Sequence, residues 1–592
     1  MRLMTLSIIA LWTASFGQAA EHKIAAELRN RAPDETVDVI VQFRHPPTDA
    51  QHQRMLYRGA HLKRSLDIIQ AAHYSLSANQ IAAISEDPDV EFISPDRPVY
   101  ATAYTGNPDY GWRTVGADMA TSVFNVDGNG IGVAVIDSGV NSHPDLGQSG
   151  SDNGHKSDGS GNSSRVVFQA SLIPGLGPND DYGHGTHVAG IIAGNGTESS
   201  GPQYSYLVHG IAPKVNIVSL RVLDANGVGT DSAVIYAIQT AIALKNQFNI
   251  RVINLSLGRP VATSYQLDPL CLAVQQAWQA GIVVVVAAGN SGRDNTLGTY
   301  GYGTITAPGN SPYVITVGAM NTVGTIARSD DKITSYSSKG PTAIDHIVKP
   351  DLVAPGNRII SLRDSGSTLD SMYPGNRVAA GVYSNGNNPN ASDYYVLSGT
   401  SMAAPMVSGA AVLLIAQNPA VTPDQIKARL MKTAAKFAPG YTTATDYSGV
   451  TYTSEYDIFT IGAGYLNVSA ALGNNDAFNG TALSPTAAYD SSTQLVNIGP
   501  TGMGAVWGTG AVWGSNAIWG TNAVWGTGAV WGSSVFINGT GAVWGSGAVW
   551  GTGAVWGSST PQAFGAVWGT GAVWGSSTLS GDALTIAING EN

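Results

Sequence analysis

The sequence contains a small set of polar residues of the types that nucleophilic catalysis requires. The stretch DYGHGTHVAG, at Asp181–Gly190, holds two histidines three residues apart among glycines. Asp137 ends the run GVAVID, Asn290 follows VVVVAAG, and Ser401 lies in LSGTSMAAP. A serine nucleophile needs a histidine base, an acid that orients the base, and a donor for the developing oxyanion. The order Asp137, His184, Asn290, Ser401 supplies all four, and we interpret them in these roles.

A metal site explains the histidines less well. A zinc-protease helix would place two histidines four residues apart with a glutamate beside the first. His184 and His187 lie three apart, and no thiolate or carboxylate cluster stands nearby to complete a shell. Taken alone, DSG is also a common turn, HGTH could be helix packing, and GTS is an ordinary helix cap. The combination and its order favour catalysis.

The elements around these residues predict an α/β domain from about 104 to 473. Near-continuous apolar runs alternate with helical stretches such as 230–245 and 270–280, as expected for parallel strands covered on both faces. The runs are IGVAVID, VNIVSLRVL, VINLSLG, IVVVVAAGN and YVITVGA. Asp137 and Asn290 then lie at strand ends, where such sheets open their crevice. Ser401 begins a helix, near unpaired N–H groups, with Pro405 in or just past its first turn.

The blocks AVIDSGV, HGTHVAG, AAGN and GTSMAAP resemble the four signature blocks of the subtilisin-like serine proteases (subtilases), in the same chain order. The resemblance covers most of residues 110–470. It implies a three-layer fold with a parallel sheet and helices on both faces, and a serine endopeptidase that hydrolyses protein or peptide substrates through an acyl-enzyme. Asp137, His184 and Ser401 match the triad, Asn290 matches the oxyanion-hole residue, and His187 matches a structural histidine. No cofactor is implied for catalysis.

The resemblance also implies where a peptide would bind. Extended substrates add as strands to cleft edges, and glycines allow close backbone approach. The pocket for the side chain before the scissile bond is expected to prefer apolar or aromatic groups, since no acidic residue is evident there. The expected substrate-binding residues are Gly227, Val228 and Gly229 on one edge, Ser256, Leu257 and Gly258 on the other, and Ala287, Ala288, Gly289 and Thr306 in the pocket.

Two departures from compact family members stand out. Residues 363–393 form most of a long insertion between His184 and Ser401, which could rim the cleft. The family's structural calcium needs an aspartate shortly after the catalytic one, and Asp145 is the candidate ligand. The partner loop at 195–210 does not clearly match, so calcium remains an open expectation.

The N-terminal region predicts export and a removable unit. Residues 1–20 have one arginine, an apolar run and small residues, which is typical of a secretory signal peptide; the alternative is a buried helix. Residues 21–103 predict the order βαββαβ, with a strand at 37–43, a helix at 51–63, a hairpin through 65–76, a helix from Ser77 and a strand at 90–93. Their end resembles the subtilase propeptide, an intramolecular inhibitor and chaperone cleaved between about Pro98 and Thr105. A retained accessory domain is the alternative.

The C-terminal region differs from the rest of the chain in composition and is repetitive. Residues 474–504 are expected to be a polar linker, 505–578 repeat GTGAVWGSG-like hexapeptides, and 579–592 end the chain. An even period places every tryptophan on one side of an extended chain, so we expect a β-rich segment. A flexible stalk, or a module that binds a surface or self-associates, is the alternative.

Composition narrows the function classes. The net charge of −11 and the lack of a basic cluster argue against nucleic acid, and no further stretch suggests a transmembrane segment. Cys271 is the only cysteine and is expected to be a small core residue. We predict a secreted enzyme (extracellular, periplasmic or at the cell surface), made as a self-processed zymogen. The alternatives are a structural or adhesive surface protein working through its tail, and a maturation protease for one partner.

Overall fold

The computed structural model describes most of the chain outside its N-terminus and its repeat region. The described residues are 22–29, 31–100, 111–147, 164–296, 298–384, 393–436, 440–446, 449–476, 480–490, 495–498, 584–586 and 588–591. The predicted signal peptide at 1–20 and the hexapeptide repeats at 505–578 lie outside these residues, as does most of the predicted cleavage region.

A small antiparallel sheet forms the N-terminal unit. Its elements are β1 (Thr36–Phe43), α2 (Asp49–Tyr57), β2 (His61–Leu66), β3 (Ala71–Ser77), α3 (Ile81–Ser85) and β4 (Val90–Pro95), and the strand order is β2-β3-β1-β4. The helix expected over 51–63 ends earlier, at Tyr57. Gly59 adopts a φ of 89°, and the residues after it pair with β3 as β2. The helix expected from Ser77 begins as a short 3₁₀ turn at Ala78–Gln80 and becomes α-helical at Ile81.

The main body is built on an eight-stranded sheet, in the order β13-β12-β11-β10-β6-β8-β7 with β14 beside β12. The strands are β6 (Gly132–Asp137), β7 (Val166–Ser171), β8 (Asn216–Arg221), β10 (Ile250–Leu255), β11 (Val283–Ala287), β12 (Ile315–Asn321), β13 (Lys332–Ile333) and β14 (Leu352–Pro355). All pairings are parallel except that of β12 with β13. The predicted α/β class with a mainly parallel sheet is confirmed.

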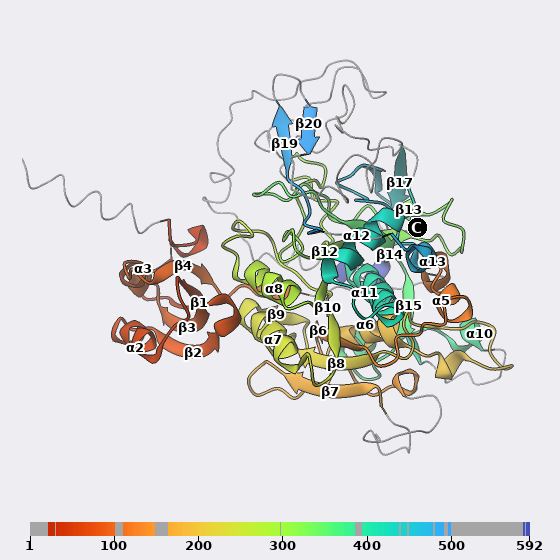
Figure 1. The fold of residues 1–592 in the computed structure, drawn as a ribbon, viewed down its shortest axis with the longest axis horizontal. Coiled ribbons are helices and arrows are strands. Elements are labelled where there is room, and N and C mark those ends of the chain that lie inside the picture. Colours follow the sequence, from red (N-terminus) through yellow and green to blue (C-terminus); the bar gives the residue numbers. More distant parts are fainter. Residues whose placement is uncertain are drawn as a thin grey trace, which may run out of the picture.

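Helices cover both faces of this sheet. The larger ones are α6 (His184–Ala193), α7 (Asp231–Leu244), α8 (Pro269–Gln279), α11 (Thr400–Gln417) and α12 (Pro423–Thr433). The shorter ones are α4 (Gly111–Thr114), α5 (Asp118–Ser122), α9 (Thr368–Met372), α10 (Ala380–Tyr383) and α13 (Val468–Gly473). Figure 1 shows α7 and α8 between the N-terminal unit and the large sheet, with α6 and α11 beyond it. Strands β6 and β11 are buried along their whole length, which explains their unbroken apolar sequence.

Smaller pairs of strands complete the body. They are β5 (Pro98–Tyr100) with β9 (Val228–Thr230), β15 (Ile359–Leu362) with β16 (Tyr394–Leu397), β17 (Tyr441–Thr445) with β18 (Thr451–Glu455), and β19 (Ala487–Asp490) with β20 (Leu495–Ile498). Part of the predicted linker is therefore ordered on the body. Ala482 is fully buried, and the Ser484 hydroxyl donates to Asp351 at 2.6 Å.

One helix has the length and apolar composition of a membrane span. This is α11, and most of its side chains are buried among β10, β11, β12 and β14. Its apolar character is that of a core helix, and no other helix within the described residues meets both criteria.

Candidate active site

Asp137 and His184 form a buried pair at the C-terminal end of β6. The Nδ1 atom of His184 lies 2.7 Å from Asp137 Oδ1, and neither side chain is exposed. The same carboxylate oxygen accepts a hydrogen bond from the Ser138 N–H at 2.8 Å. A proton on Nδ1 is therefore held by the carboxylate, which leaves Nε2 with its lone pair. No hydrogen bond to this Nε2 is present within the described residues.

Asp180 fixes the turn that carries His184, and sequence reasoning missed it. Its Oδ2 accepts from the backbone N–H and hydroxyl of Thr186 at 2.8 and 2.7 Å, and its Oδ1 accepts from the Gly183 N–H at 2.7 Å. The Ser138 hydroxyl also donates to Oδ1, at 2.8 Å. Burial raises the pKa of this carboxyl group. Asp180 thus satisfies the N–H groups at the start of α6. The only feature of the sequence that pointed to Asp180 is its place four residues before His184.

Ser401 lies in the first turn of α11 and exchanges two hydrogen bonds with Ser256, just past the end of β10. Its hydroxyl donates to the Ser256 carbonyl at 3.0 Å, and the Ser256 hydroxyl donates to the Ser401 carbonyl at 2.7 Å. Pro405 is the sixth residue of α11, beyond the first turn, and cannot donate to the Ser401 carbonyl four residues earlier. Ser256 supplies the donor that Pro405 lacks, which fixes the helix start.

The sheet brings Ser401 and His184 to the same edge. Strands β6 and β10 are parallel neighbours with Val135 opposite Asn254, so the register continues toward Asp137 opposite Ser256. Helices α6 and α11, whose first turns hold His184 and Ser401, pack against each other. In this state Ser401 Oγ is bonded to a carbonyl rather than to His184 Nε2. Catalytic hydrogen bonds often form only once substrate is bound.

Asn290 joins this group through Thr400. Its Oδ1 accepts from the Thr400 N–H at 2.9 Å and from the Thr400 hydroxyl at 3.0 Å. The Thr400 hydroxyl in turn accepts from the Gly289 N–H at 3.1 Å. Because the side-chain oxygen is committed to Thr400, the orientation of the amide is set and its NH₂ group points to the other side. The structure therefore brings Asn290 next to the residue that precedes Ser401.

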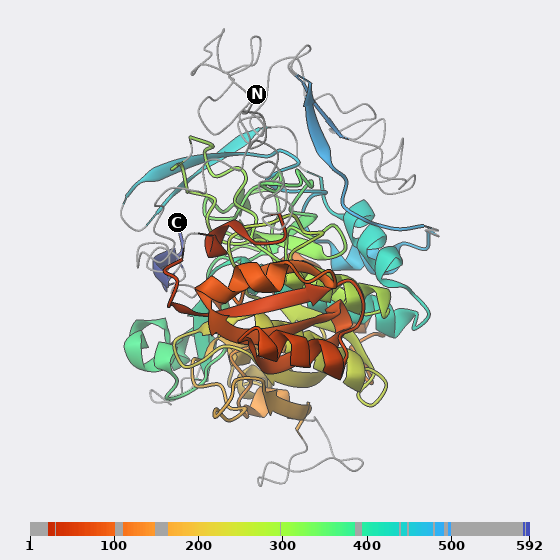
Figure 2. The ribbon, with the colours of Figure 1, turned by 90° about the vertical axis from the view of Figure 1, so that its left-hand side faces the viewer.

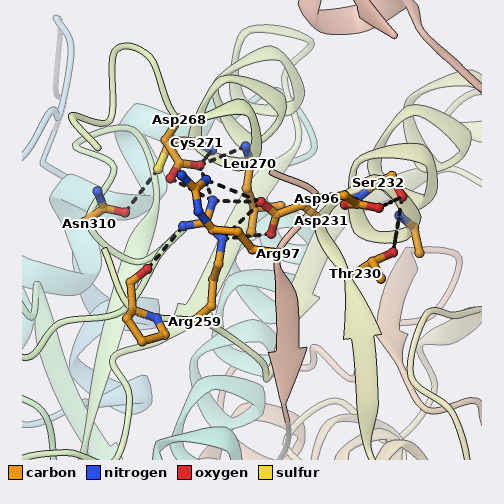
Figure 3. A network of polar contacts seen from close by, with 12 residues as sticks. Asp96, Arg97, Thr230, Asp231, Ser232, Arg259, Asp268, Leu270, Cys271 and Asn310 are labelled. Atoms are coloured by element: carbon orange, nitrogen blue, oxygen red, sulfur yellow. Dashed lines mark hydrogen bonds and ion pairs between the residues drawn. The ribbon is translucent and has the colours of Figure 1, made fainter. Parts of the chain in front are cut away.

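The predicted edges of a peptide cleft are joined by one buried ion-pair network (Figure 3). Arg259, which follows Ser256–Gly258, donates to Asp231, which follows β9, and to Asp268 at the start of α8. All three side chains are nearly or fully buried. The network was not predicted from the sequence. It fixes the segment 256–258 relative to the segment 227–229.

The chain that follows the N-terminal unit occupies the edge of β9. Strand β5 pairs with it antiparallel, with Val99 opposite Gly229. Asp96 accepts from the Ser232 N–H at 2.6 Å and from its hydroxyl at 2.5 Å, and Arg97 Nη1 lies 3.9 Å from Asp231. In Figure 2 the N-terminal unit covers α7 and α8. One extended segment is therefore already added where a substrate strand was predicted.

The residues predicted to line the side-chain pocket also lie together. The Thr306 N–H donates to the Ala288 carbonyl at 3.0 Å, and its hydroxyl reaches the same oxygen at 3.3 Å.

Gly227, on the opposite edge, has a φ of 74°, and a Cβ there would come within 2.7 Å of the Tyr182 ring. A side chain larger than glycine does not fit at this position.

Asp145, the predicted calcium ligand, accepts hydrogen bonds from protein donors in this structure. Asp145 Oδ1 accepts from the Glu198 N–H at 2.8 Å, and Oδ2 accepts from the Tyr394 hydroxyl at 2.8 Å. Burial raises the pKa of this carboxyl group. No group of three or more histidine, cysteine or acidic side chains able to hold a metal occurs in the described part of the chain. The carboxylate is satisfied by protein donors.

Two other sequence interpretations concern buried residues. His187 is fully buried, and its Nε2 lies 3.1 Å from both the Ile359 and Tyr395 carbonyls. Desolvation lowers the pKa of His187 to about 3, so the ring is neutral at ordinary pH. Cys271 is buried in a small apolar cluster, and burial raises the pKa of its thiol well above the usual value. The prediction of a core cysteine is confirmed.

The long insertion packs beside the histidine turn. Thr368 and Leu369 donate backbone hydrogen bonds to the carbonyls of Asp181 and Tyr182 at 3.0 and 3.1 Å. Asp370 accepts from both Arg363 and Arg377, and hydrogen bonds from Arg363 and the Gly366 N–H lower its pKa to about 2. The insertion thus contacts the segment that leads into His184.

Comparison with known proteins identifies the family. The sequence model of the subtilase family matches residues 128–488. The chain is 40% identical over 308 residues to serine protease AprX of Bacillus subtilis (strain 168), a match covering 51% of this chain and 60% of that relative. It is 31% identical over 417 residues to subtilisin E of the same strain, covering 70% of this chain and 84% of the relative. A similar match, 31% over 364 residues, covers 97% of subtilisin DY from Bacillus licheniformis. The chain therefore belongs to the subtilase family and is a subtilisin-like serine protease.

Proposed function

We propose that Asp137, His184 and Ser401 form the catalytic triad of this serine endopeptidase. The observation that carries the proposal is the buried Asp137–His184 pair, whose Nε2 carries no hydrogen bond within the described residues, at the sheet edge where Ser401 begins α11. Ser401 Oγ attacks the scissile carbonyl, and His184 Nε2 takes its proton and passes it to the leaving amine. Water then releases the acyl group by the reverse sequence. Asp137 holds the productive tautomer and stabilises the imidazolium.

Asn290 and the Ser401 N–H are proposed to stabilise the oxyanion. The Asn290 side-chain oxygen bonds to Thr400, which supports this role because the NH₂ group is then the end that faces away from Thr400. Donors fixed before the reaction need no reorganisation as charge develops on the substrate oxygen.

Substrate is proposed to bind as a strand between segments 227–229 and 256–258, with Ala287–Gly289 and Thr306 around the side chain before the scissile bond. The antiparallel pairing of β5 on β9 supports this, because it demonstrates that the edge of β9 accepts an extended chain. The same pairing supports the proposal that residues 21–103 inhibit the enzyme until they are cleaved away.

Export through residues 1–20 stays a prediction, as do self-processing and a surface-binding or self-associating role for the repeats. Calcium, with Asp145 as the candidate ligand, also stays a prediction. A secreted protease without disulfides would gain stability from such an ion.

The test follows size and N-terminal sequence over time for the chain starting at Ala20. Wild type is compared with Ser401→Ala and with the exposed control Ser122→Ala. We expect wild type and the control to lose the residues before about Thr105 and then to hydrolyse casein, while Ser401→Ala stays intact. If all three stay intact and inert with calcium present, the triad assignment is wrong. If Ser401→Ala is cut like wild type, self-processing is excluded. A broad cleavage profile would exclude a dedicated maturation protease.

A further inference from the structure

A short segment that follows the repeat region is embedded in the peptidase body. Residues 584–586 and 588–591 lie against the body, where Glu591 contacts the residues just after β13 and β17. Figure 2 shows this segment in dark blue beside the C-terminus. Ile586 is 5% exposed and joins the main hydrophobic core, with Leu584 and Ile588 packed against it. This apolar contact is the first of two attachments.

Glu591 provides the second attachment, through its carboxylate. The side chain is fully buried, and its two oxygens accept from the Ser335 N–H at 2.9 and 3.1 Å. Oε2 also accepts from the Ser335 hydroxyl at 2.5 Å and from Arg293 Nη2 at 2.9 Å. Arg293 lies 4.8 Å from the Tyr452 ring centroid. A buried carboxylate is tolerated when it is matched by a cation and by hydrogen bonds in this way.

The backbone of Glu591 is held as well. The Asn357 side chain donates to the Glu591 carbonyl at 3.0 Å and accepts from the Glu591 N–H at 3.2 Å. Asp446 forms an antiparallel bridge with Glu591 from the other side. Asn357 is 1% exposed, so its amide would lose these two bonds inside the protein if the segment left.

The residues that hold Glu591 are connected to the segments of the candidate active site. Asn357 follows Gly356, whose carbonyl accepts from the Gly399 N–H at 2.7 Å, two residues before Ser401. Arg293 comes three residues after Asn290. Arg293 thus connects Glu591 to the loop of the proposed oxyanion donor. Asn357 connects it to a neighbour of the loop that carries the proposed nucleophile.

We propose that Arg293, Ser335 and Asn357 form a peptide-binding site on the peptidase body, and that its ligand is the segment 584–591 of the same chain, through Glu591. The site recognises a carboxylate, the adjoining peptide group and an isoleucine five residues earlier. The segment remains bound when the chain between it and the body is cut. The repeat region can then be removed without loss of this segment, and the segments around Arg293 and Asn357 keep their contacts with it.

The test uses the full chain with Ser401→Ala to prevent self-digestion and a site-specific protease sequence inserted after Ser580. After cleavage, gel filtration and native mass spectrometry measure how much of the freed peptide stays with the body. We expect retention for wild type and at least a ten-fold faster loss for Glu591→Ala. Asp582→Ala is the matched control, because it removes one negative charge from the same peptide and should leave retention unchanged.

Two results would overturn the proposal. One is loss of the wild-type peptide as fast as the Glu591→Ala peptide, and the other is an equal effect of Asp582→Ala. Glu591→Gln keeps the side-chain shape and is measured alongside, so that an alanine chain that fails to fold does not decide the question. The glutamine peptide should also leave faster, because it lacks the charge that pairs with Arg293.

Discussion

Replacing Arg259 with methionine should destabilise the peptidase body strongly. The guanidinium makes five hydrogen bonds of 2.8–3.0 Å to Asp231 and Asp268, and all three side chains are buried. Methionine roughly fills the space of the arginine stem but leaves two carboxylates without their cation. The variant therefore loses stability because the two carboxylates lose their cation, and not because a cavity is formed.

The size of the effect follows from the burial of the partners. Removing one member of a buried ion pair costs about 3–5 kcal/mol, which is a factor of roughly 10² to 10⁴ in the folding equilibrium. Arg97 lies 3.9 Å from Asp231 and offsets part of this cost while the N-terminal unit is bound. The cost should therefore be larger once residues 21–103 have been removed.

The stability that is lost in the Arg259→Met variant should also depend on pH. Burial raises the pKa of Asp231 to about 6 even though Arg259 opposes that shift. Without Arg259 the pKa rises further, so the folded variant binds a proton that the unfolded chain, with its lower pKa, has released. Stability of the variant relative to wild type should therefore improve as pH falls from 7 toward 5.

Urea unfolding followed by circular dichroism measures the loss of stability and its pH dependence in a Ser401→Ala background, which keeps residues 21–103 attached. The matched control is Lys214→Met, which removes the cation of an exposed pair with Asp127 and should cost no more than about 1 kcal/mol. Adding Asp231→Asn and Asp268→Asn to Arg259→Met should recover much of the loss, because no unpaired carboxylate is then buried and Arg97 keeps its pair with Glu27. A loss below about 1 kcal/mol for Arg259→Met, or no recovery in the triple variant, would refute the reasoning.

Three further outcomes are expected. Burial holds the pKa of His187 at about 3 in the folded protein, below its value in the unfolded chain. Stability should therefore fall by on the order of a few kcal/mol as pH falls from 6.5 toward 3. The His187→Gln variant should show a flatter dependence of stability on pH over this range. Asp145→Asn and Tyr394→Phe should each lower the melting temperature by the same amount with EDTA as with calcium, since the two side chains bond to each other; a calcium-dependent difference would support the metal prediction. Gly183→Ala should lower kcat/KM, because the residue has a φ of 98° and a Cβ there would lie 2.4 Å from Ser367 Oγ; adding Ser367→Gly should recover part of the activity but not all of it.

The sequence was most informative where the function depends on short motifs. Asp137, His184 and Asn290 could be placed because each sits at the end or start of an element with a clear apolar pattern, and parallel strands bring their ends to one edge. The parallel sheet itself followed from runs such as Val283–Val286, which only a strand buried on both faces explains.

Sequence reasoning missed residues whose partners are distant in the chain. Glu591 binds Ser335, 256 residues away, and Arg259 binds Asp231, 28 residues away, so no local pattern marks either contact. Element boundaries failed for a similar reason. The pattern after Gln51 suits a helix, but pairing with β3 turned residues 61–66 into a strand.

The position of residues 584–591 also bears on when the protein can finish folding. Chains are made at about 5–20 residues per second, and their N-terminal parts fold first. Arg293, Ser335 and Asn357 are synthesised before the repeats at 505–578, whereas Glu591 comes after them. During synthesis the site that binds Glu591 is therefore without this side chain for on the order of ten seconds, while the repeats are translated. Gain or loss of repeats during evolution would lengthen or shorten that delay without altering any residue of the body.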